Sequence, residues 1–370
     1  MMRIALVTPG FAPEVGGIES YVQRLSVELN ALGYAVDVLT QCPRGRAAEW
    51  SASVINPGIR VLRFGDWTGT RRFRIAPGLW RYLRHNGPSY DVIHVHSFHA
   101  IPALAACAAT DQPIVFSPYY HGRGHTIPAR LLHLIYDKLA KRIFERSSFI
   151  FCLTDAEVQT VTRDYPASAS RVRKVGAGID VDLIRQAEPF DVDRPIVLLV
   201  GRLEAYKNID RAVEAFAICD CDADMVIIGS GPERGRIIDL ANELGIGSRV
   251  RMLGYVDDAV ARSWQRTATV VMSLSAVESF GLGAAEAAVA GARVLVSDIP
   301  AHRDVAAMAG DMFEFVDLGS KNTVVADVLR RALLAPRLPN TNCTFPTWRE
   351  VSIRISEFYQ RVEPVSPSKM

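Results

Sequence analysis

The feature that most constrains how this chain can fold is the alternation of short apolar segments with helical patterns. The segment Arg3–Thr8 is typical of a buried strand, and a helical stripe that includes Leu25 and Leu29 follows it. Ala35–Leu39 is strand-like again, and the same alternation starts afresh at Pro195–Val200. Alternating strands and helices predict parallel sheets with helices on both faces. The 370 residues suffice for two such domains, so we expect an α/β protein with two doubly wound, Rossmann-like domains.

A polar segment between the two sets of strands predicts where the domains meet. Glu188–Arg194 is polar and contains a proline, which is typical of a linker. We accordingly expect a first domain over residues 1–188 and a second over residues 189–346. Residues 347–370 then form a terminal helix and tail, with aromatic and apolar residues at helical spacing from Trp348 onward.

The composition is that of an ordinary soluble protein. Charged residues make up 22% and hydrophobic residues 49%, and the net charge is +2. The charge is uneven, with 22 Lys+Arg against 15 Asp+Glu in residues 1–186 and 20 against 25 in residues 187–370. The six cysteines show no paired metal spacing, and no apolar stretch reaches the roughly 18–20 residues that span a bilayer. We expect a cytoplasmic protein with reduced thiols and no nucleic-acid partner.

One segment of the second half combines a glycine-rich junction with two glutamates. The apolar run Ala268–Leu274 predicts a strand, and an alanine-rich helix follows the glycines at 281 and 283. Free N–H groups at the start of a helix suit a phosphate, and glycine lets the backbone approach it closely.

Two carboxylates flank this junction with seven residues between them. Glu278 precedes the glycines, and Glu286 lies about two turns into the helix. A carboxylate accepts two hydrogen bonds from vicinal hydroxyl groups, so each glutamate can hold a sugar or ribose diol. The residues alone leave open that these are ordinary solvated glutamates of an amphipathic helix.

A pair of cations follows the first strand of the second half. Arg202 and Lys207 are five residues apart, in the loop and first helical turn after Pro195–Val200. Two cations at this spacing can clamp a diphosphate between them. Taken alone, they are also compatible with a basic pair on a surface loop.

These two segments together resemble the motifs of glycosyltransferase family 4, a family of retaining nucleotide-sugar glycosyltransferases with the GT-B fold. Its acidic motif has a glutamate, a small residue, Phe-Gly and a second glutamate eight positions after the first. Glu278-Ser279-Phe280-Gly281 and Glu286 reproduce all of it, and Gly201-Arg202-Leu203 with Lys207-Asn208 resembles the family's basic motif. The resemblance extends over nearly the whole chain.

The resemblance implies an architecture and a reaction. Two domains face each other across a cleft, and the C-terminal helix crosses back to the first domain. Members transfer a hexosyl group from a nucleotide diphosphate sugar to a hydroxyl acceptor with retention of configuration. They need no metal, because arginine and lysine stabilise the leaving diphosphate. We expect no cofactor besides the co-substrate, and a UDP-sugar donor in preference to a GDP-sugar.

The first half carries further segments that are similar to this family. The loop that ends in Gly16-Gly17 resembles the family's loop near the donor diphosphate, although a glycine pair before a helix is also an ordinary turn. His121-Gly122 matches a motif whose histidine lies close to the reacting sugar. His96 corresponds to a histidine near the acceptor side. A metal site at His94 and His96 is disfavoured, because no carboxylate is poised beside them.

The resemblance therefore implies a complete set of site residues. Those assigned to catalysis are His121, Arg202, Lys207 and Glu278. Those assigned to donor binding are Gly16, Gly17, Arg202, Lys207, Gly229, Tyr255, Glu278, Phe280, Gly281, Leu282 and Glu286. His96 lies on the acceptor side, and no residue is assigned to a metal. Ala177 departs from the family pattern, which has an asparagine there, and alanine cannot replace its hydrogen bonds.

A basic stretch over Arg71–Arg84 has aromatic residues interleaved with its arginines. Arg71, Arg72, Arg74, Arg81 and Arg84 fit either of two interpretations. They are solvated residues of an amphipathic surface helix, or they form a face for an anionic acceptor or a membrane surface. The second interpretation makes the protein membrane-peripheral.

Two other function classes stay open beside the glycosyltransferase. Another GT-B enzyme such as a nucleotide-sugar 2-epimerase would use similar nucleotide contacts, and a non-catalytic partner subunit would keep only the fold. A dinucleotide-dependent oxidoreductase is excluded, because the fingerprint Gly-x-Gly-x-x-Gly is absent. The acceptor, which is a glycolipid, a polysaccharide precursor or a small natural product in the family, is not readable from the chain.

Overall fold

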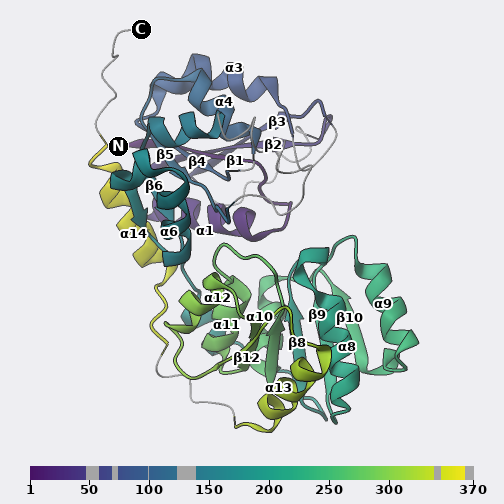
Figure 1. Ribbon diagram of the computed structural model, residues 1–370. Coiled ribbons are helices and arrows are strands. Elements are labelled where there is room, and N and C mark those ends of the chain that lie inside the picture. The colour runs from purple at the N-terminus through teal and green to yellow at the C-terminus, as the bar shows by residue number, and fades with distance from the viewer. Residues whose placement is uncertain (47–57, 69–73, 99, 123–138, 337–342, 363–370) are drawn as a thin grey trace. The chain divides into compact units, whose positions relative to one another are not determined.

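The computed structural model describes residues 1–46, 58–68, 74–98, 100–122, 139–336 and 343–362 (Figure 1). The chain divides into two compact units, of which the first joins Met1–Ala177 to Trp348–Met370 and the second is Gly178–Thr347. Each unit is built on a parallel sheet with helices, so the expectation of two doubly wound α/β units is confirmed.

The first unit contains a seven-stranded parallel sheet in the order β3-β2-β1-β4-β5-β6-β7. Its strands are β1 (Arg3–Thr8), β2 (Ala35–Cys42), β3 (Ile59–Gly65), β4 (Val92–His96), β5 (Ile114–Ser117), β6 (Ser147–Cys152) and β7 (Val172–Lys174). Its described helices are α1 (Gly17–Ala31), α3 (Pro77–Asn86), α4 (Ile101–Ala109), α6 (Asp155–Asp164) and α14 (Trp348–Tyr359), with short turns η1 (Gly87–Ser89) and η2 (Pro166–Arg171).

The second unit contains a six-stranded parallel sheet in the order β10-β9-β8-β11-β12-β13. Its strands are β8 (Ile196–Val200), β9 (Asp224–Ile228), β10 (Val250–Gly254), β11 (Val270–Ser273), β12 (Arg293–Ser297) and β13 (Phe313–Val316). Its helices are α7 (Val181–Gln186), α8 (Ile209–Cys219), α9 (Arg234–Glu243), α10 (Asp258–Thr267), α11 (Leu282–Ala290), α12 (Pro300–Ala306) and α13 (Asn322–Leu334), with short turns η3 (Ala205–Lys207) and η4 (Gly247–Arg249).

The strand order of each sheet reverses once, and this positions the loops that matter for function. In the first unit, β2 and β3 lie on one side of β1, and β4 and the later strands lie on its other side. In the second unit, β9 and β10 lie on one side of β8, and β11 and the later strands lie on its other side. Open α/β sheets bind ligands at the carboxyl ends of the strands that flank such a reversal. The loops that follow β8 and β11 carry the basic pair and the two-glutamate segment predicted from the sequence.

The boundary between the units lies at Ala177, not at residue 188 as predicted. Helix α7 packs against α10 and α11 and therefore belongs to the second unit. The Ile179 N–H donates to the carbonyl of Pro346 at 2.9 Å, which ties both ends of this unit together. The polar segment taken for a linker is also anchored there, because the ring of Phe190 packs on Trp264 with centroids 4.7 Å apart.

Helix α14 belongs to the first unit, as the sequence predicted, although it follows the second unit along the chain. The Tyr359 hydroxyl lies 2.6 Å from Nδ1 of His94 on β4, and Arg354 donates to the carbonyl of Val175 at 2.7 Å. The Trp348 ring meets that of Tyr21 on α1 edge to face, with centroids 5.2 Å apart. These contacts fix the helix to three separate parts of the unit.

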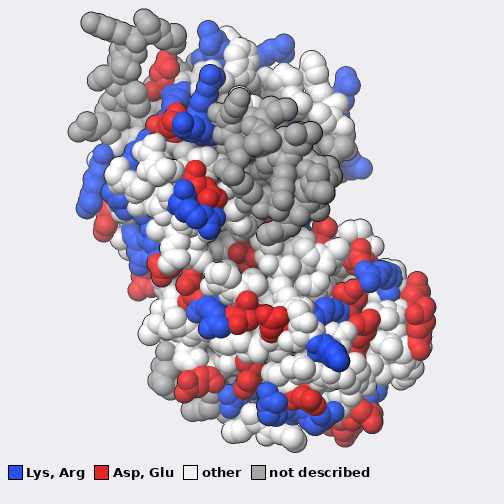
Figure 2. Space-filling view, viewed as in Figure 1, with Lys and Arg blue, Asp and Glu red and all other residues white. Residues whose placement is uncertain are grey.

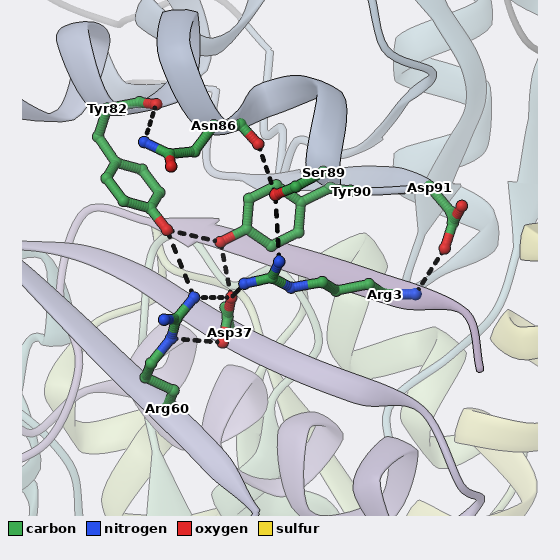
Figure 3. A network of polar contacts seen from close by, with 8 residues as sticks. All are labelled: Arg3, Asp37, Arg60, Tyr82, Asn86, Ser89, Tyr90 and Asp91. Atoms are coloured by element: carbon green, nitrogen blue, oxygen red, sulfur yellow. Dashed lines mark hydrogen bonds and ion pairs between the residues drawn. The ribbon is translucent and has the colours of Figure 1, made fainter.

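A charged network around Asp37 fastens the first three strands together (Figure 3). Arg60 donates two hydrogen bonds to the Asp37 carboxylate at 3.0 and 2.6 Å, and Arg3 donates a third at 2.8 Å. The Tyr90 hydroxyl donates another at 2.7 Å. Burial would raise the pKa of Asp37, but hydrogen bonds from Arg60, Tyr90 and Arg3 outweigh burial and lower it. The arginines are structural here, because a buried charge needs such partners.

The prediction that Arg74 belongs to a solvated or membrane-facing set was wrong. Arg74 is only 6% exposed, and it donates to both carboxylate oxygens of Glu14 at 2.7 and 2.9 Å. Its Nε also lies 3.4 Å from the Asp66 carboxylate. The Arg74 guanidinium is therefore the counter-charge of two largely buried carboxylates, and it stabilises the fold instead of facing solvent or a membrane.

The other arginines of the basic stretch Arg71–Arg84 fall into two groups. Arg81 and Arg84 are exposed on α3, and the Arg84 guanidinium lies over the Trp80 ring at 5.6 Å. Arg71, Arg72 and Phe73 lie outside the described residues.

Charges elsewhere are mixed. Figure 2 shows Lys, Arg, Asp and Glu interspersed over the visible face of the second unit. Within the described part of the chain, no helix has the length and apolar character needed to cross a membrane.

Candidate active site

Two loops of the second unit are joined side by side at the carboxyl ends of β8 and β11. The Asn208 side chain donates to the carbonyl of Leu274 at 2.8 Å, and the Ala276 N–H donates to the carbonyl of Tyr206 at 2.8 Å. Asn208 adopts a left-handed conformation with φ 50°, which asparagine tolerates better than most residues. The asparagine that follows Lys207 therefore closes the loop pair, a role that the sequence motif did not reveal.

The loop pair brings Lys207 and Glu278 into direct contact. The Lys207 ammonium group donates to Glu278 Oε1 at 2.6 Å, and both side chains are 18% exposed. Burial would raise the pKa of Glu278, but the charge and hydrogen bond of Lys207, together with a hydrogen bond from Ser275, lower it. The lysine and the first glutamate of the predicted site thus form one partly buried ion pair.

Arg202 borders the same hollow as Lys207. This hollow is lined by residues of both loops, including Gly201, Arg202, Lys207 and Ser275. The Arg202 guanidinium is exposed, and it donates to the Tyr206 hydroxyl at 2.9 Å. The structure thus places Arg202 and Lys207 beside one hollow at the end of β8, and their role in binding a diphosphate stays a prediction.

Helix α11 begins where the sequence placed the glycine-rich junction. Gly281 is its N-cap with φ 100° and contributes no side-chain hydrogen bond, and Leu282 is the first helical residue. Phe280 is buried beside them. The Ala284 N–H donates to the carbonyl of Gly281 at 3.0 Å, so the N–H groups of Leu282 and Gly283 precede the intrahelical hydrogen bonds and can donate to an anion.

A histidine that sequence analysis missed lies directly behind Gly281. His302 on α12 is fully buried, and a Cβ atom at Gly281 would lie 3.2 Å from its Cδ2. Its Nδ1 lies 2.9 Å from the carbonyl of Ser297, so Nδ1 carries the proton. Burial lowers the pKa of His302 despite this carbonyl and Glu278, which both raise it. Among described atoms, Nε2 has no hydrogen-bond partner. The sequence signal for His302 was only its position, five residues after the end of β12.

The second glutamate of the motif is held by a neighbouring helix. Glu286 is half-buried on α11, and the Gln265 side chain on α10 donates to its Oε2 at 2.8 Å. Gln265 is 2% exposed. No sequence motif pointed to this glutamine.

Gly229 and Tyr255, which the family resemblance assigns to donor binding, follow β9 and β10. A Cβ atom at Gly229 would lie 1.8 Å from the carbonyl oxygen of Gly201, so only glycine fits there. The Gly229 N–H already donates to the carbonyl of Gly254 at 2.7 Å. Tyr255 is 62% exposed beside it. Contact of Gly229 and Tyr255 with the donor stays a prediction.

The remaining predicted residues lie in the first unit. Gly16 is the N-cap of α1 and Gly17 is its first residue. A Cβ atom at Gly16 would lie 2.3 Å from the Glu19 carboxylate, so a larger residue at this position would displace the Glu19 side chain. His121 is exposed in the loop after β5. Ala177 is fully buried.

His94 and His96 lie side by side on β4, with ring centroids 4.1 Å apart. His96 is fully buried, and its Nδ1 lies 2.9 Å from the Tyr119 hydroxyl. Burial lowers the pKa of His96 to about 3, so the ring is neutral. Among the described residues, no group of three or more His, Cys, Asp or Glu is arranged to hold a metal ion.

Glu157 holds the loop that leads to His121. Thr154 caps α6 and accepts from the Glu157 N–H at 3.1 Å. The buried Glu157 carboxylate accepts from the N–H groups of Tyr120 and Leu153, both at 2.7 Å. Burial raises the pKa of Glu157 to about 7, although these backbone hydrogen bonds lower it. The capping pattern was visible in the sequence, but this second contact was not.

Two doubly wound units, with a basic pair and a glutamate pair at the strand reversal of the second, define a GT-B glycosyltransferase. Residues 15–183 match the domain described as Glycosyltransferase Family 4, and residues 180–330 match the domain described as Glycosyl transferases group 1. The chain belongs to the GT-B glycosyltransferases of the family 4 type, and it is an enzyme of that class.

Curated relatives and solved structures agree with this placement. The chain is 26% identical to a D-inositol 3-phosphate glycosyltransferase of Xylanimonas cellulosilytica, over 99% of this chain and 98% of the relative. It is 27% identical to a glycogen synthase of Mycobacterium tuberculosis, over 80% of this chain and 78% of the relative.

Among solved structures, sucrose-phosphate synthase of Thermosynechococcus elongatus matches with a TM-score of 0.79 at 21% identity, covering 98% of this chain and 99% of that one. HepE of Anabaena, solved with UDP and glucose, matches with a TM-score of 0.74 at 16% identity, covering 98% and 100%. These likenesses show the fold.

Proposed function

We propose that this protein transfers a hexosyl group from a nucleotide diphosphate sugar to a hydroxyl acceptor with retention of configuration. The observation that carries the proposal is the contact of Lys207 with Glu278, beside Arg202 and the open N-terminal end of α11. Two cations that line one hollow suit a leaving diphosphate, and the N–H groups at the start of a helix suit a phosphate as well. The relatives that act on inositol phosphate and glycogen support the sugar-transfer class.

The roles of the second-unit residues follow from the charges that the reaction creates. Arg202 and Lys207 stabilise the diphosphate as the glycosidic bond breaks, and the first turn of α11 at Gly281 and Leu282 donates to it. When the bound diphosphate replaces Glu278 as the hydrogen-bond partner of the Lys207 ammonium group, the Glu278 carboxylate becomes available to the transferred sugar. Glu286 holds the ribose hydroxyl groups.

The roles of the remaining residues rest on the family resemblance. Phe280, Gly229 and Tyr255 complete the donor site around the nucleotide. Gly16 and Gly17 approach the diphosphate, His121 the transferred sugar and His96 the acceptor.

The donor is proposed to be a UDP-sugar, and the reaction to need no metal ion. Arg202 and Lys207 supply the positive charge that a divalent cation gives to other transferases. The solved complex of HepE with UDP and glucose supports the nucleotide. Chelation should leave turnover unchanged, and activity that is abolished by chelation and restored by magnesium or manganese would count against this part.

The acceptor carries a hydroxyl group and is proposed to be anionic or lipid-linked. The inositol-phosphate relative supports an anionic acceptor. We place the enzyme in the cytoplasm, with peripheral membrane contact through the exposed part of Arg71–Arg84.

The experiment is to incubate the protein with a panel of UDP-, GDP- and dTDP-sugars and to score the nucleoside diphosphate released. Lys207→Ala should abolish release, while Lys321→Ala, which removes an exposed lysine from the same unit, should not. Nuclear magnetic resonance of the product anomer then tests retention. A donor converted only to its C2 epimer would favour the epimerase, and no conversion of any donor would favour the non-catalytic subunit.

A further inference from the structure

The contact between Gln265 and Glu286 joins two helices of the second unit. Gln265 lies on α10 and Glu286 on α11, and these helices pack against each other. The Gln265 Nε2 group donates to Oε2 of Glu286 at 2.8 Å. A hydrogen bond to one carboxylate oxygen fixes the rotation of the carboxylate plane, which otherwise turns freely about its last torsion.

Packing alone does not account for a buried amide at position 265. Its side chain is 2% exposed, and among described atoms its Oε1 has no hydrogen-bond partner. A buried amide with an unpaired oxygen is less favourable than an apolar side chain of the same shape. The polar contribution of this residue is therefore the bond that it donates to Glu286.

A carboxylate that receives a vicinal diol must present its oxygens in one orientation. Two neighbouring hydroxyl groups donate in nearly parallel directions, so a freely rotating carboxylate pays entropy when it binds them. Glu286 is half-buried on α11. The hydrogen bond that Gln265 donates to its Oε2 constrains that orientation.

We propose that Gln265 is a positioning residue that orients Glu286 to accept both ribose hydroxyl groups of the donor nucleotide. This inference rests on the ribose-binding role given to Glu286 under the proposed function. It makes Gln265 a determinant of the preference for ribonucleotides over 2′-deoxyribonucleotides, although Gln265 itself does not touch the nucleotide.

The test measures nucleotide binding by isothermal titration calorimetry with UDP and 2′-deoxy-UDP, and with GDP and 2′-deoxy-GDP in parallel. The wild type should bind the ribonucleotide of its preferred base about tenfold more tightly than the deoxy form, the value of one hydrogen bond to a charged group. Gln265→Met keeps the shape but cannot donate, so the preference should fall to about twofold. Its melting temperature should be unchanged or higher, which a merely structural glutamine would not give.

Matched variants separate this inference from the proposed function. Arg262→Met changes the same helix without touching Glu286 and should keep the full preference. Gln265→Glu places a second carboxylate beside Glu286 and should lose the preference at pH 8 even if the methionine variant folds poorly. In Gln265→Met/Glu286→Gln, the two losses should not add, because they remove one interaction.

The result that would overturn the inference is a Gln265→Met or Gln265→Glu protein that keeps the wild-type preference while Glu286→Gln loses it. The ribose role of Glu286 would then stand without Gln265. If Glu286→Gln itself keeps the preference, the ribose assignment falls, and the inference falls with it.

Discussion

At the scale of single residues, the two cations of the site differ in what they do for the fold. Lys207 is partly buried against Glu278, whereas Arg202 is exposed beside Tyr206. Removal of Lys207 leaves a carboxylate with little water and no counter-charge, which is costly. Removal of Arg202, whose side chain is exposed, does not leave a buried carboxylate without its counter-charge.

We therefore predict that Arg202→Ala and Lys207→Ala both cut transfer by orders of magnitude but differ in stability. In the proposed mechanism each variant removes a charge that stabilises the leaving diphosphate, worth about 3–4 kcal/mol. Only Lys207→Ala should lower the unfolding free energy, by about 1–3 kcal/mol. Steady-state turnover and chemical denaturation of both variants check this. Near-wild-type turnover in both would remove the cation pair from the mechanism.

The two glutamates should fail in different ways. In the proposed mechanism Glu286 holds the ribose, which does not change during the reaction, so this interaction is uniform binding and Glu286→Ala should raise the donor KM more than it lowers kcat. The same proposal has Glu278 act on the transferred sugar, so Glu278→Gln should mainly lower kcat. The measurement is steady-state kinetics with varied donor. The opposite pattern in the two variants would mean that the assignment is reversed.

The buried carboxyl of Glu157 predicts a pH dependence of stability. Its pKa is raised by burial from 4.5 to about 7 in the folded protein. Between these values the folded state keeps a proton that the unfolded state releases, so the unfolding free energy falls as pH rises. The wild type should lose roughly 2–3 kcal/mol over this range relative to Glu157→Gln, which cannot titrate.

Chemical denaturation at pH 4.5, 6 and 7.5 checks this prediction. Asp155→Asn, on the exposed start of the same helix, is the control and should keep the wild-type slope. Parallel curves for wild type and Glu157→Gln would contradict it.

The sequence predicted some site residues and missed others for a physical reason. Lys207, Glu278 and Gly281 were found because each lies in a strand-loop-helix junction whose local spacing has chemical meaning. Gln265 contacts Glu286, and His302 lies beside Gly281, because separate helices pack together. No local pattern records such contacts, so only the fold could reveal them.

At the scale of elements, the strands and helices were predicted more reliably than the exposure of their side chains. Arg74 precedes α3 by a few residues and has the same charge as Arg81 and Arg84, yet it is buried by Glu14 and Asp66. Periodicity could not show this, because both carboxylates come from other loops. Among the described residues of this stretch, Trp80, Arg81 and Arg84 on α3 stay exposed and are available to an anionic partner.

We predict that this α3 surface binds anionic vesicles more strongly than neutral ones. Each basic residue near an anionic surface contributes about 1 kcal/mol, so Arg81→Gln/Arg84→Gln should weaken binding by roughly tenfold or more. Co-sedimentation with vesicles of mixed anionic and zwitterionic lipid measures this, and Lys321→Gln in the second unit serves as the control. Equal binding to both vesicle types would end the membrane interpretation.

At the scale of the whole molecule, the chain returns to its first unit after it has completed the second. The predicted boundary was misplaced because composition marks a polar segment, whereas packing decides which unit it joins. Phe190 and α7 are held by the second unit, and α14 by the first. The terminal helix was predicted correctly because its apolar stripe had to be buried somewhere, and the family resemblance indicated where.

The contact that holds α14 in place gives a prediction about each unit separately. The Tyr359 hydroxyl lies 2.6 Å from Nδ1 of His94, whose Nε2 lies 2.8 Å from the Ser117 hydroxyl. Tyr359→Phe leaves a fully buried imidazole nitrogen without a partner, which costs about 1–3 kcal/mol. Because α14 belongs to the first unit, the loss should appear as faster hydrogen exchange in α14, α1 and β4.

The second unit should exchange at its wild-type rate in the same protein. Arg361→Ala, which changes the end of the chain near α14 without touching His94, is the control and should leave both units unchanged. Hydrogen exchange followed by mass spectrometry resolves the two units in one experiment. If Tyr359→Phe instead accelerates exchange in β8, β11 and α11 as much as in β4, α14 stabilises both units, and the division of the chain at Ala177 and Trp348 does not describe how it unfolds.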